Sequence, residues 1–189
     1  MLSVARALKG AKTPILGINA GQLGFLTAAP ISKLKSVLQH IWEENYSIDT
    51  RPFIEAVIGN DSSRQLAVND FVITRGELSR MIQLNVSVDG GFLTTYQCDG
   101  LIVSSPTGTT AYSLSAGGPI VSPNSEVMTL TPICPHALSN RSVIVPFQST
   151  IEVEVGQHLP ETILTADGQD SITLAHGDQI HFRQSKHQL

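Results

Sequence analysis

The chain has 189 residues, a formal net charge of −4, and 41% hydrophobic against 15% charged residues. This length and composition predict a soluble globular protein of one domain, or of one domain with part of another. The acidic balance argues against a general nucleic-acid-binding protein, and no apolar run approaches the ~18 residues that span a bilayer. Residues 1–10 lack the apolar segment of a secretory signal, so we expect a cytoplasmic protein.

The first part of the chain alternates helix and strand patterns. Residues 1–10 predict an amphipathic helix that ends at Gly10. The apolar side chains on one side of this helix are Leu2, Ala5 and Leu8. Residues 14–18 predict a buried strand, and a glycine-rich link follows at 19–26.

A second helix is predicted at residues 31–46. Its inward-facing side chains would be Leu34, Val37, Leu38 and Ile41. The order of helix, strand, glycine-rich turn and helix indicates a partial α/β, Rossmann-like lobe over residues 1–48. Without the rest of such a lobe, we expect Leu26, Ile41 and Trp42 to form an exposed apolar surface that drives association.

Residues 49–189 change to short β-type runs separated by turn residues, which predicts a strand-rich, largely antiparallel domain. The predicted strands are residues 53–59, 66–74, 81–88, 92–98, 101–103, 142–145, 150–155, 162–166, 171–174 and 179–183. Asp89-Gly-Gly91 predicts a tight hairpin. Cys98 and Cys134 are the only cysteines and lack metal-ligand spacing, so we expect two buried free thiols and no metal site.

Residues 99–119, DGLIVSSPTGTTAYSLSAGGP, are the most informative segment. Asp99 precedes a buried strand, and a loop rich in hydroxyl groups then surrounds Pro106 and Gly108 before a helical turn at 110–115. Such a loop presents hydroxyl and backbone N–H groups to a polar ligand, and Gly108 allows close backbone approach. The segment resembles the ligand loop of the NAD kinase family, with Ser105 and Thr109 as hydroxyl-conserving changes.

The resemblance extends over nearly the whole chain in the family's order. The further segments that carry it are residues 17–26 (GINAGQLGFL), 67–73 (AVNDFVI), 131–141 (TPICPHALSNR) and 166–169 (ADGQ). It implies a partial Rossmann-like lobe followed by a β-sandwich lobe that binds NAD over residues 49–189. It also implies phosphorylation of the 2′-hydroxyl of the adenosine ribose of NAD by ATP or polyphosphate with a divalent metal such as Mg²⁺, without a tightly bound cofactor.

The resemblance assigns a set of dinucleotide contacts. Phe25 and Leu26 would form an apolar wall near adenine, and Arg80 would assist a phosphate. The remaining implied contacts are Asn69, Asp70, Asp99, Thr110, Ala111, Tyr112, Ser113, Leu114, Ser115 and Gln169. The family also implies homodimers or homotetramers whose copies complete each other's sites.

The family's phosphoryl-transfer centre, a GGDG motif, is absent from this sequence, so no catalytic base is assigned. The chain would then be a fragment of a full kinase or a short relative that keeps the binding lobe. Two other functions stay open at this point: a non-catalytic NAD(P)-binding or assembly module, and a lipid kinase of the diacylglycerol-kinase type. The Asn69-Asp70 pair and the TAYS loop at 110–113 favour the dinucleotide.

Overall fold

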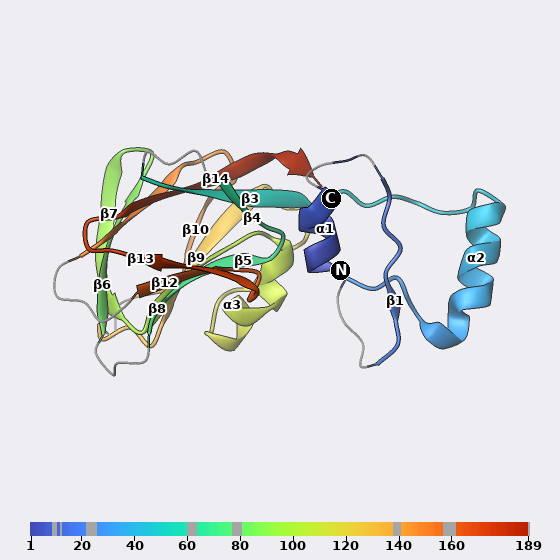
Figure 1. The fold of residues 1–189 in the computed structure, drawn as a ribbon, viewed down its shortest axis with the longest axis horizontal. Helices are drawn as coiled ribbons and strands as arrows, with labels where there is room; N and C mark the ends of the chain where they lie inside the picture. The colour runs from blue at the N-terminus through green and yellow to red at the C-terminus, as the bar shows by residue number, and fades with distance from the viewer. Residues whose placement is uncertain are drawn as a thin grey trace.

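The computed structural model describes residues 1–8, 11, 13–21, 26–59, 64–76, 81–137, 141–156 and 162–188. Over these residues the chain is mainly β, with two antiparallel sheets stacked as a sandwich and an N-terminal α/β segment at one end (Figure 1). The predicted fold class, a partial α/β piece followed by a β-sandwich, is therefore confirmed. In the part of the chain described here, no helix is long and apolar enough to cross a membrane.

The N-terminal segment consists of short elements. They are α1 (Leu2–Leu8), β1 (Ile18–Asn19), β2 (Ala29–Pro30), the 3-10 helix η1 (Ile31–Lys33) and α2 (Leu34–Trp42). The first predicted helix is confirmed over α1, although its expected end at Gly10 lies outside the described residues. Ala5 packs against Phe53 and Val68, which attaches α1 to the sandwich.

Two predictions for this segment are wrong. The strand expected at 14–18 is only β1, and Leu16 is exposed. None of the α2 residues is buried: Leu34 and Val37 are half-buried, whereas Leu38 and Ile41 are exposed. A helix buries its apolar side only against another layer, and the parallel pair β1–β2 is too short to provide one.

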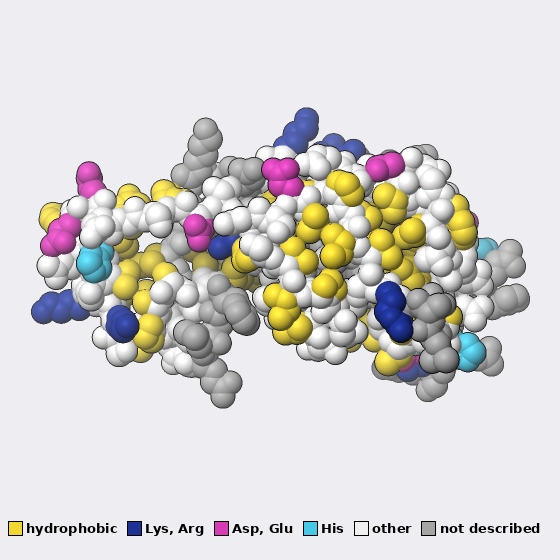
Figure 2. Space-filling view, turned by 180° about the vertical axis from the view of Figure 1, so that it is seen from behind, with side chains coloured by type: hydrophobic (Ala, Val, Ile, Leu, Met, Phe, Trp, Pro, Cys, Tyr) yellow, Lys and Arg dark blue, Asp and Glu magenta, His cyan; other side chains and the backbone are white. Residues whose placement is uncertain are grey.

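The apolar side of α2 borders an open hollow of about 930 Å³ (Figure 2). The hollow is lined by Leu16, Leu26, Val37, Ile41 and Tyr46, among others. Trp42 is 90% exposed beside it. Exposed apolar surface at Ile41 and Trp42 is thus confirmed and Leu26 is half-buried, while the association that this surface would drive stays a prediction.

The sandwich consists of two sheets, defined here over the described residues. Sheet 1 has the order β10-β9-β8-β5-β12-β13 and contains β5 (Asp70–Arg75), β8 (Gly100–Ser104), β9 (Val127–Ile133), β10 (Val143–Pro146), β12 (Thr162–Ala166) and β13 (Asp170–Leu174). Sheet 2 has the order β4-β3-β14-β11-β6-β7 and contains β3 (Pro52–Ile58), β4 (Arg64–Ala67), β6 (Ile82–Val88), β7 (Gly91–Cys98), β11 (Ile151–Val155) and β14 (Gln179–Gln188).

The predicted hairpin at Asp89-Gly-Gly91 joins β6 to β7, as expected. Asp89 and Gly90 have φ values of 52° and 77°, the left-handed pair that matches the twist of two-residue hairpins. Most other predicted strands also lie within a residue or two of their expected positions.

Three strand-level predictions need correction. The single strand expected at 66–74 is two strands, β4 and β5, which belong to different sheets because the chain crosses between them at Val68 and Asn69. Strand β9 was not predicted. Cys98 is buried as expected, but Cys134 is exposed; it lies just after the end of β9, with a φ of 45°.

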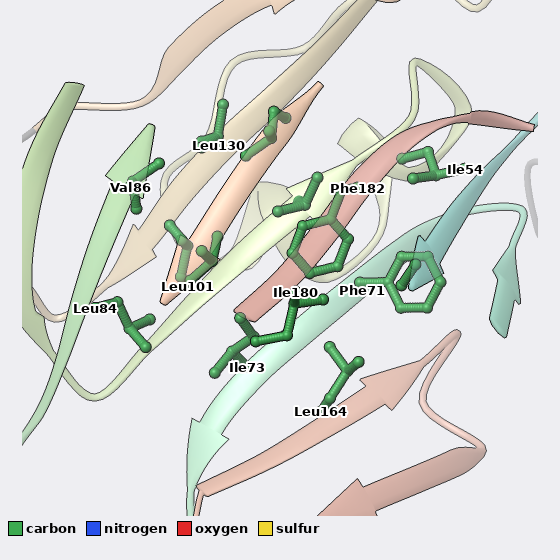
Figure 3. Close-up of a cluster of buried hydrophobic side chains, with 14 of the residues drawn as sticks. Ile54, Phe71, Ile73, Leu84, Val86, Leu101, Leu130, Leu164, Ile180 and Phe182 are labelled. Atoms are coloured by element: carbon green, nitrogen blue, oxygen red, sulfur yellow. The ribbon is translucent and has the colours of Figure 1, made fainter. Parts of the chain in front are cut away.

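The core lies between the sheets and is built from alternate residues of each strand (Figure 3). In β5, Phe71 and Ile73 point into it, and the Phe71 ring packs on Phe182 with centroids 5.4 Å apart. Since side chains alternate along a strand, Asp70 and Val72 face the outer side of sheet 1. This alternation places a buried carboxylate on the face of the sheet that turns away from the core.

Candidate functional site

A polar row lies on the outer face of sheet 1. Asp70 of β5 pairs with Ser104 of β8, which pairs with Thr129 of β9, so the three side chains lie on one face. All three residues are buried. The 3-10 helix η2 (Thr107–Thr110) and the single-turn helix α3 (Tyr112–Ser115) cover this face, as expected for a helical turn at 110–115. The candidate site is therefore this row and the η2–α3 loop above it.

The η2–α3 loop is clamped to the point where the chain crosses between the sheets. The Ser105 hydroxyl donates to the Val68 carbonyl oxygen over 2.5 Å, and the Ser105 backbone N–H donates to the Asn69 carbonyl oxygen over 2.9 Å. A Cβ on Gly108 would lie 2.0 Å from that same oxygen. Gly108 thus allows a close backbone approach to Asn69 within the chain, while the expected approach to a ligand stays a prediction.

Replacing Gly108 with alanine is expected to lower the free energy of unfolding by about 2–4 kcal/mol, since backbone rather than a movable side chain blocks the new methyl group. Urea denaturation would measure the loss. Gly91→Ala is the matched control, because a Cβ there meets only the Val88 carbonyl oxygen at 3.4 Å. Equal stability of the Gly108 variant and the wild type would contradict this account of the loop.

Asp70 is the most perturbed acid of the site. It is only 4% exposed, and its Oδ2 atom is buried with no hydrogen-bond partner. Burial, and then the negative charge of Asp167, raise the pKa of Asp70 to about 7, although a hydrogen bond from the Tyr112 backbone lowers it. The Thr107 hydroxyl is also buried without a partner. The Thr129 hydroxyl of the row is buried without a partner as well, so three polar groups of the loop and row remain available to a ligand.

Asp167 fixes the backbone beside Asp70. Its carboxylate accepts hydrogen bonds from the backbone N–H groups of Val68 and Asn69 over 3.1 and 2.8 Å. Arg6 of α1 donates to this carboxylate over 3.2 Å and to the side-chain oxygen of Gln169 over 2.9 Å. The exposed Gln169 therefore lies in the same turn as the buried group that holds Asn69.

The structure brings most of the predicted contacts together. Those gathered at the row and its covering loop are Asn69, Asp70, Thr110, Ala111, Tyr112, Ser113, Leu114, Ser115 and Gln169. Tyr112 and Leu114 are 46% and 42% exposed, whereas the Ser113 hydroxyl is buried 3.1 Å from the Thr131 hydroxyl. The Ser113 side chain thus holds α3 on the sheet, while Tyr112 presents an aromatic ring to solvent.

Asp99 lies elsewhere. Thr74 pairs with Gly100 at one end of β5, and Asp70 pairs with Ser104 at the other. Asp99 is five residues from Ser104, so at ~3.3 Å per residue it lies about 16–17 Å from Asp70 along the strand. It forms an ion pair with Arg75 over 3.4 Å. Of the remaining predicted contacts, Leu26 borders the hollow at α2, and Phe25 and Arg80 lie outside the described residues.

Within the described residues, no three His, Cys, Asp or Glu side chains gather in a way that could hold a metal ion. The Asp167 carboxylate instead faces backbone N–H groups and Arg6. This part of the chain therefore does not fit a protein-held divalent cation.

Comparison with known proteins decides the family. Residues 68–189 match the ATP-NAD kinase C-terminal domain, and residues 1–46 match the ATP-NAD kinase N-terminal domain. The chain belongs to the NAD kinase family. It is 43% identical to the NAD kinase of Syntrophotalea carbinolica and 46% identical to that of Moorella thermoacetica, each over 98% of this chain. It spans 66% and 60% of the lengths of these two relatives.

Solved structures of this family share the fold. A yeast NADH kinase complexed with NADH superposes with a TM-score of 0.86 at 35% identity, over 91% of this chain and 51% of that one. An Archaeoglobus fulgidus NAD kinase in complex with ATP superposes with a TM-score of 0.81 at 30% identity, over 98% and 71%. Membership of the NAD kinase family removes the reason to consider a lipid kinase.

Sequence reasoning missed two residues of the site. Asp167 was part of the ADGQ segment, but only Gln169 was assigned a contact, although an acid followed by glycine between two strands is also a hairpin signal. Arg6 gave no signal, because its partners lie some 160 residues away in the chain.

Proposed function

We propose that this chain is the dinucleotide-binding part of an NAD kinase, which phosphorylates the 2′-hydroxyl of the adenosine ribose of NAD to form NADP. The observation that carries the proposal is the buried, unpartnered Oδ2 of Asp70 under the loop that exposes Tyr112. A buried polar atom without a hydrogen-bond partner costs about 1–3 kcal/mol of stability. The unpartnered Oδ2 atom of Asp70 is therefore explained if a bound ligand donates a hydrogen bond to it. The relatives named above are NAD kinases or bind NADH and ATP, which supplies the ligand class.

In this proposal the residues of the site bind and orient NAD. The Asn69 amide pairs with polar edges of the dinucleotide, Asp70 accepts a hydrogen bond from a ribose hydroxyl, and the Tyr112 ring packs on a base. The other predicted loop residues and Gln169 complete the surface. A non-catalytic NAD(P)-binding module would use the same contacts. A measurement of NADP formation distinguishes such a module from a kinase.

The phosphoryl donor is proposed to be ATP or polyphosphate. Mg²⁺ would neutralise charge on the transferred phosphates, and it enters with the donor, because magnesium in such sites is held largely by substrate phosphates. The described residues offer no cage of their own for it. The proton acceptor and the glycine-rich phosphate cradle are assigned to a GGDG-containing segment, which this sequence lacks.

Calorimetry with the purified chain tests the proposal. NAD or NADP should bind saturably, and a folded chain that binds neither up to millimolar concentrations would exclude a dinucleotide site.

The cytoplasm is the proposed compartment, since the free thiols of Cys98 and Cys134 suit a reducing environment.

We also propose that the working form is a homodimer or homotetramer. Asp99 is too far from Asp70 to join the same row, so it would contact the dinucleotide held by a neighbouring copy. Its carboxylate is about a third exposed and leaves room for a further partner beside Arg75.

Mixing two defective variants tests this arrangement. Asp70→Asn and Asp99→Ala should each weaken NAD binding by about 1–3 kcal/mol. In an equal mixture, roughly one quarter of the sites should regain wild-type affinity, because a mixed pair places both intact acids at one of its two sites. Calorimetry after co-refolding would show the restored class of sites. No restoration in a sample that forms mixed dimers would place both acids in one copy or remove Asp99 from the site.

A further inference from the structure

The carboxylate of Asp167 lies where α1, the crossing between the sheets and the β12–β13 hairpin meet. It accepts hydrogen bonds from three consecutive backbone N–H groups, those of Val68, Asn69 and Asp70, over 3.1, 2.8 and 3.4 Å. In return, the Asp167 backbone N–H donates to the Asp70 carbonyl oxygen over 2.9 Å. Its side chain is fully buried. One carboxylate therefore sets the backbone of the whole crossing.

Arg6 connects this carboxylate to α1. Its guanidinium donates to Asp167 over 3.2 Å and to the Ala166 carbonyl oxygen over 3.1 Å, and it pairs with Asp170 over 2.9 Å. The Arg6 side chain is only 12% exposed. Among the described residues, these contacts place the Arg6 cation beside the carboxylates of Asp167 and Asp170, and the Asp70 carboxyl group beside Asp167. Removing Arg6 would leave the buried Asp167 without its counter-ion.

The backbone at the crossing fixes the positions of two side chains that are proposed to contact the ligand. Asn69 and Asp70 leave the backbone at the two residues whose N–H groups Asp167 holds, and the Asn69 carbonyl oxygen also anchors the η2–α3 loop. We propose that Asp167 is a positioning residue of the dinucleotide site, and that Arg6 couples this position to α1. This inference rests on the proposed function, since the ligand is the NAD assigned there.

The test variants are chosen from the hydrogen-bond donors that face the Asp167 carboxylate. Asp167→Asn replaces one acceptor oxygen by an NH₂ group that faces N–H donors, so at least one backbone N–H loses its partner. Arg6→Gln keeps the carboxylate and removes its counter-ion, and Arg6→Lys restores the charge without the fork geometry. We expect the dissociation constant for NAD to rise at least tenfold in Asp167→Asn and in Arg6→Gln, with partial recovery in Arg6→Lys. If Asp167→Asn fails to fold, the dissociation constant of Arg6→Gln for NAD tests the proposal.

Two further measurements exclude a merely structural role. Arg183→Gln is the matched control, because Arg183 donates over 2.6 Å to the buried Glu55 in sheet 2. It should lower stability but leave the NAD affinity unchanged. Carbon-13 NMR of the carboxyl groups should show the pKa of Asp70 falling in Asp167→Asn, because a negative neighbour is removed. Wild-type NAD affinity in folded Asp167→Asn or Arg6→Gln would overturn the inference.

The failure of this inference differs from a failure of the proposed function. If the wild-type chain binds no NAD, the proposed function fails. The positioning role of Asp167 is then tested by the NMR signals of the Asn69 side-chain amide and the Asp70 carboxyl group. Signals that shift in Asp167→Asn and stay in place in Arg183→Gln support it. Signals that are unchanged in Asp167→Asn overturn it.

Discussion

Incubated with NAD, ATP and Mg²⁺, the 189-residue chain is expected to form NADP no faster than background. Transfer to the 2′-hydroxyl requires that oxygen to be aligned with the γ-phosphoryl group, with the charge neutralised and a proton acceptor in reach. Asp70 and Asp99 are assigned to binding, and no glycine-rich phosphate cradle with a free carboxylate exists elsewhere in the sequence. Loss of a general base alone lowers rates ~10²–10⁴-fold, and loss of the phosphate cradle adds to it.

A chimera provides the positive control. The N-terminal part of the Moorella thermoacetica NAD kinase that this chain does not cover, joined before Met1, should restore NADP formation. Replacing by Asn the Asp of the GGDG motif that the family resemblance assigns to this part should abolish the restored activity. If the isolated chain formed NADP rapidly and Asp70→Asn abolished this activity, Asp70 would be the base. That result would contradict the assignment of Asp70 to binding and of the base to a GGDG-containing segment.

The sandwich could be predicted because its strands are separated by local turn signals. Asp89-Gly-Gly91 shows the principle: two left-handed residues are needed, and the sequence provides them where the strands reverse. The crossing at Val68 and Asn69 could not be predicted in this way. Residues 66–74 were read as one strand across Asn69-Asp70, and the backbone at the crossing is held by Asp167, almost 100 residues later in the chain.

The resemblance assigned residues to one site, and the structure shows which of them lie together, while their contact with NAD stays a prediction. Asn69, Asp70 and the 110–115 segment were assigned by resemblance and do meet at one end of sheet 1. The strand register that separates Asp99 from them is a long-range property, and so is the burial that perturbs Asp70. The expected burial of Ile41 on α2 failed for a related reason, since the periodicity of a helix shows which side is apolar but not whether anything covers it.

Asp70→Asn is expected to stabilise the chain at neutral and alkaline pH while weakening NAD binding at least tenfold. The pKa of Asp70 is about 7 in the folded protein, against an ordinary value of 3.8. A rise of this size corresponds to roughly 4 kcal/mol of unfavourable free energy once the folded carboxyl group is ionised. An amide carries no charge, but it must still be buried, so we expect a net gain of about 2–4 kcal/mol at pH 8.

The pH dependence of this gain is its signature. Because the pKa is raised on folding, the contribution of Asp70 to stability is complete below pH 4 and decreases as the pH rises from about 4 to about 7. The Asn variant lacks this decrease, so the stability difference between variant and wild type should be small at pH 4, intermediate at pH 5.5 and constant above pH 7.5. Urea denaturation of both proteins at these pH values measures it. A difference that is independent of pH would contradict the raised pKa. A variant that is less stable than the wild type at pH 8 would show that the carboxylate is satisfied within the fold, and the argument that Asp70 is kept for a ligand would then lose its physical basis.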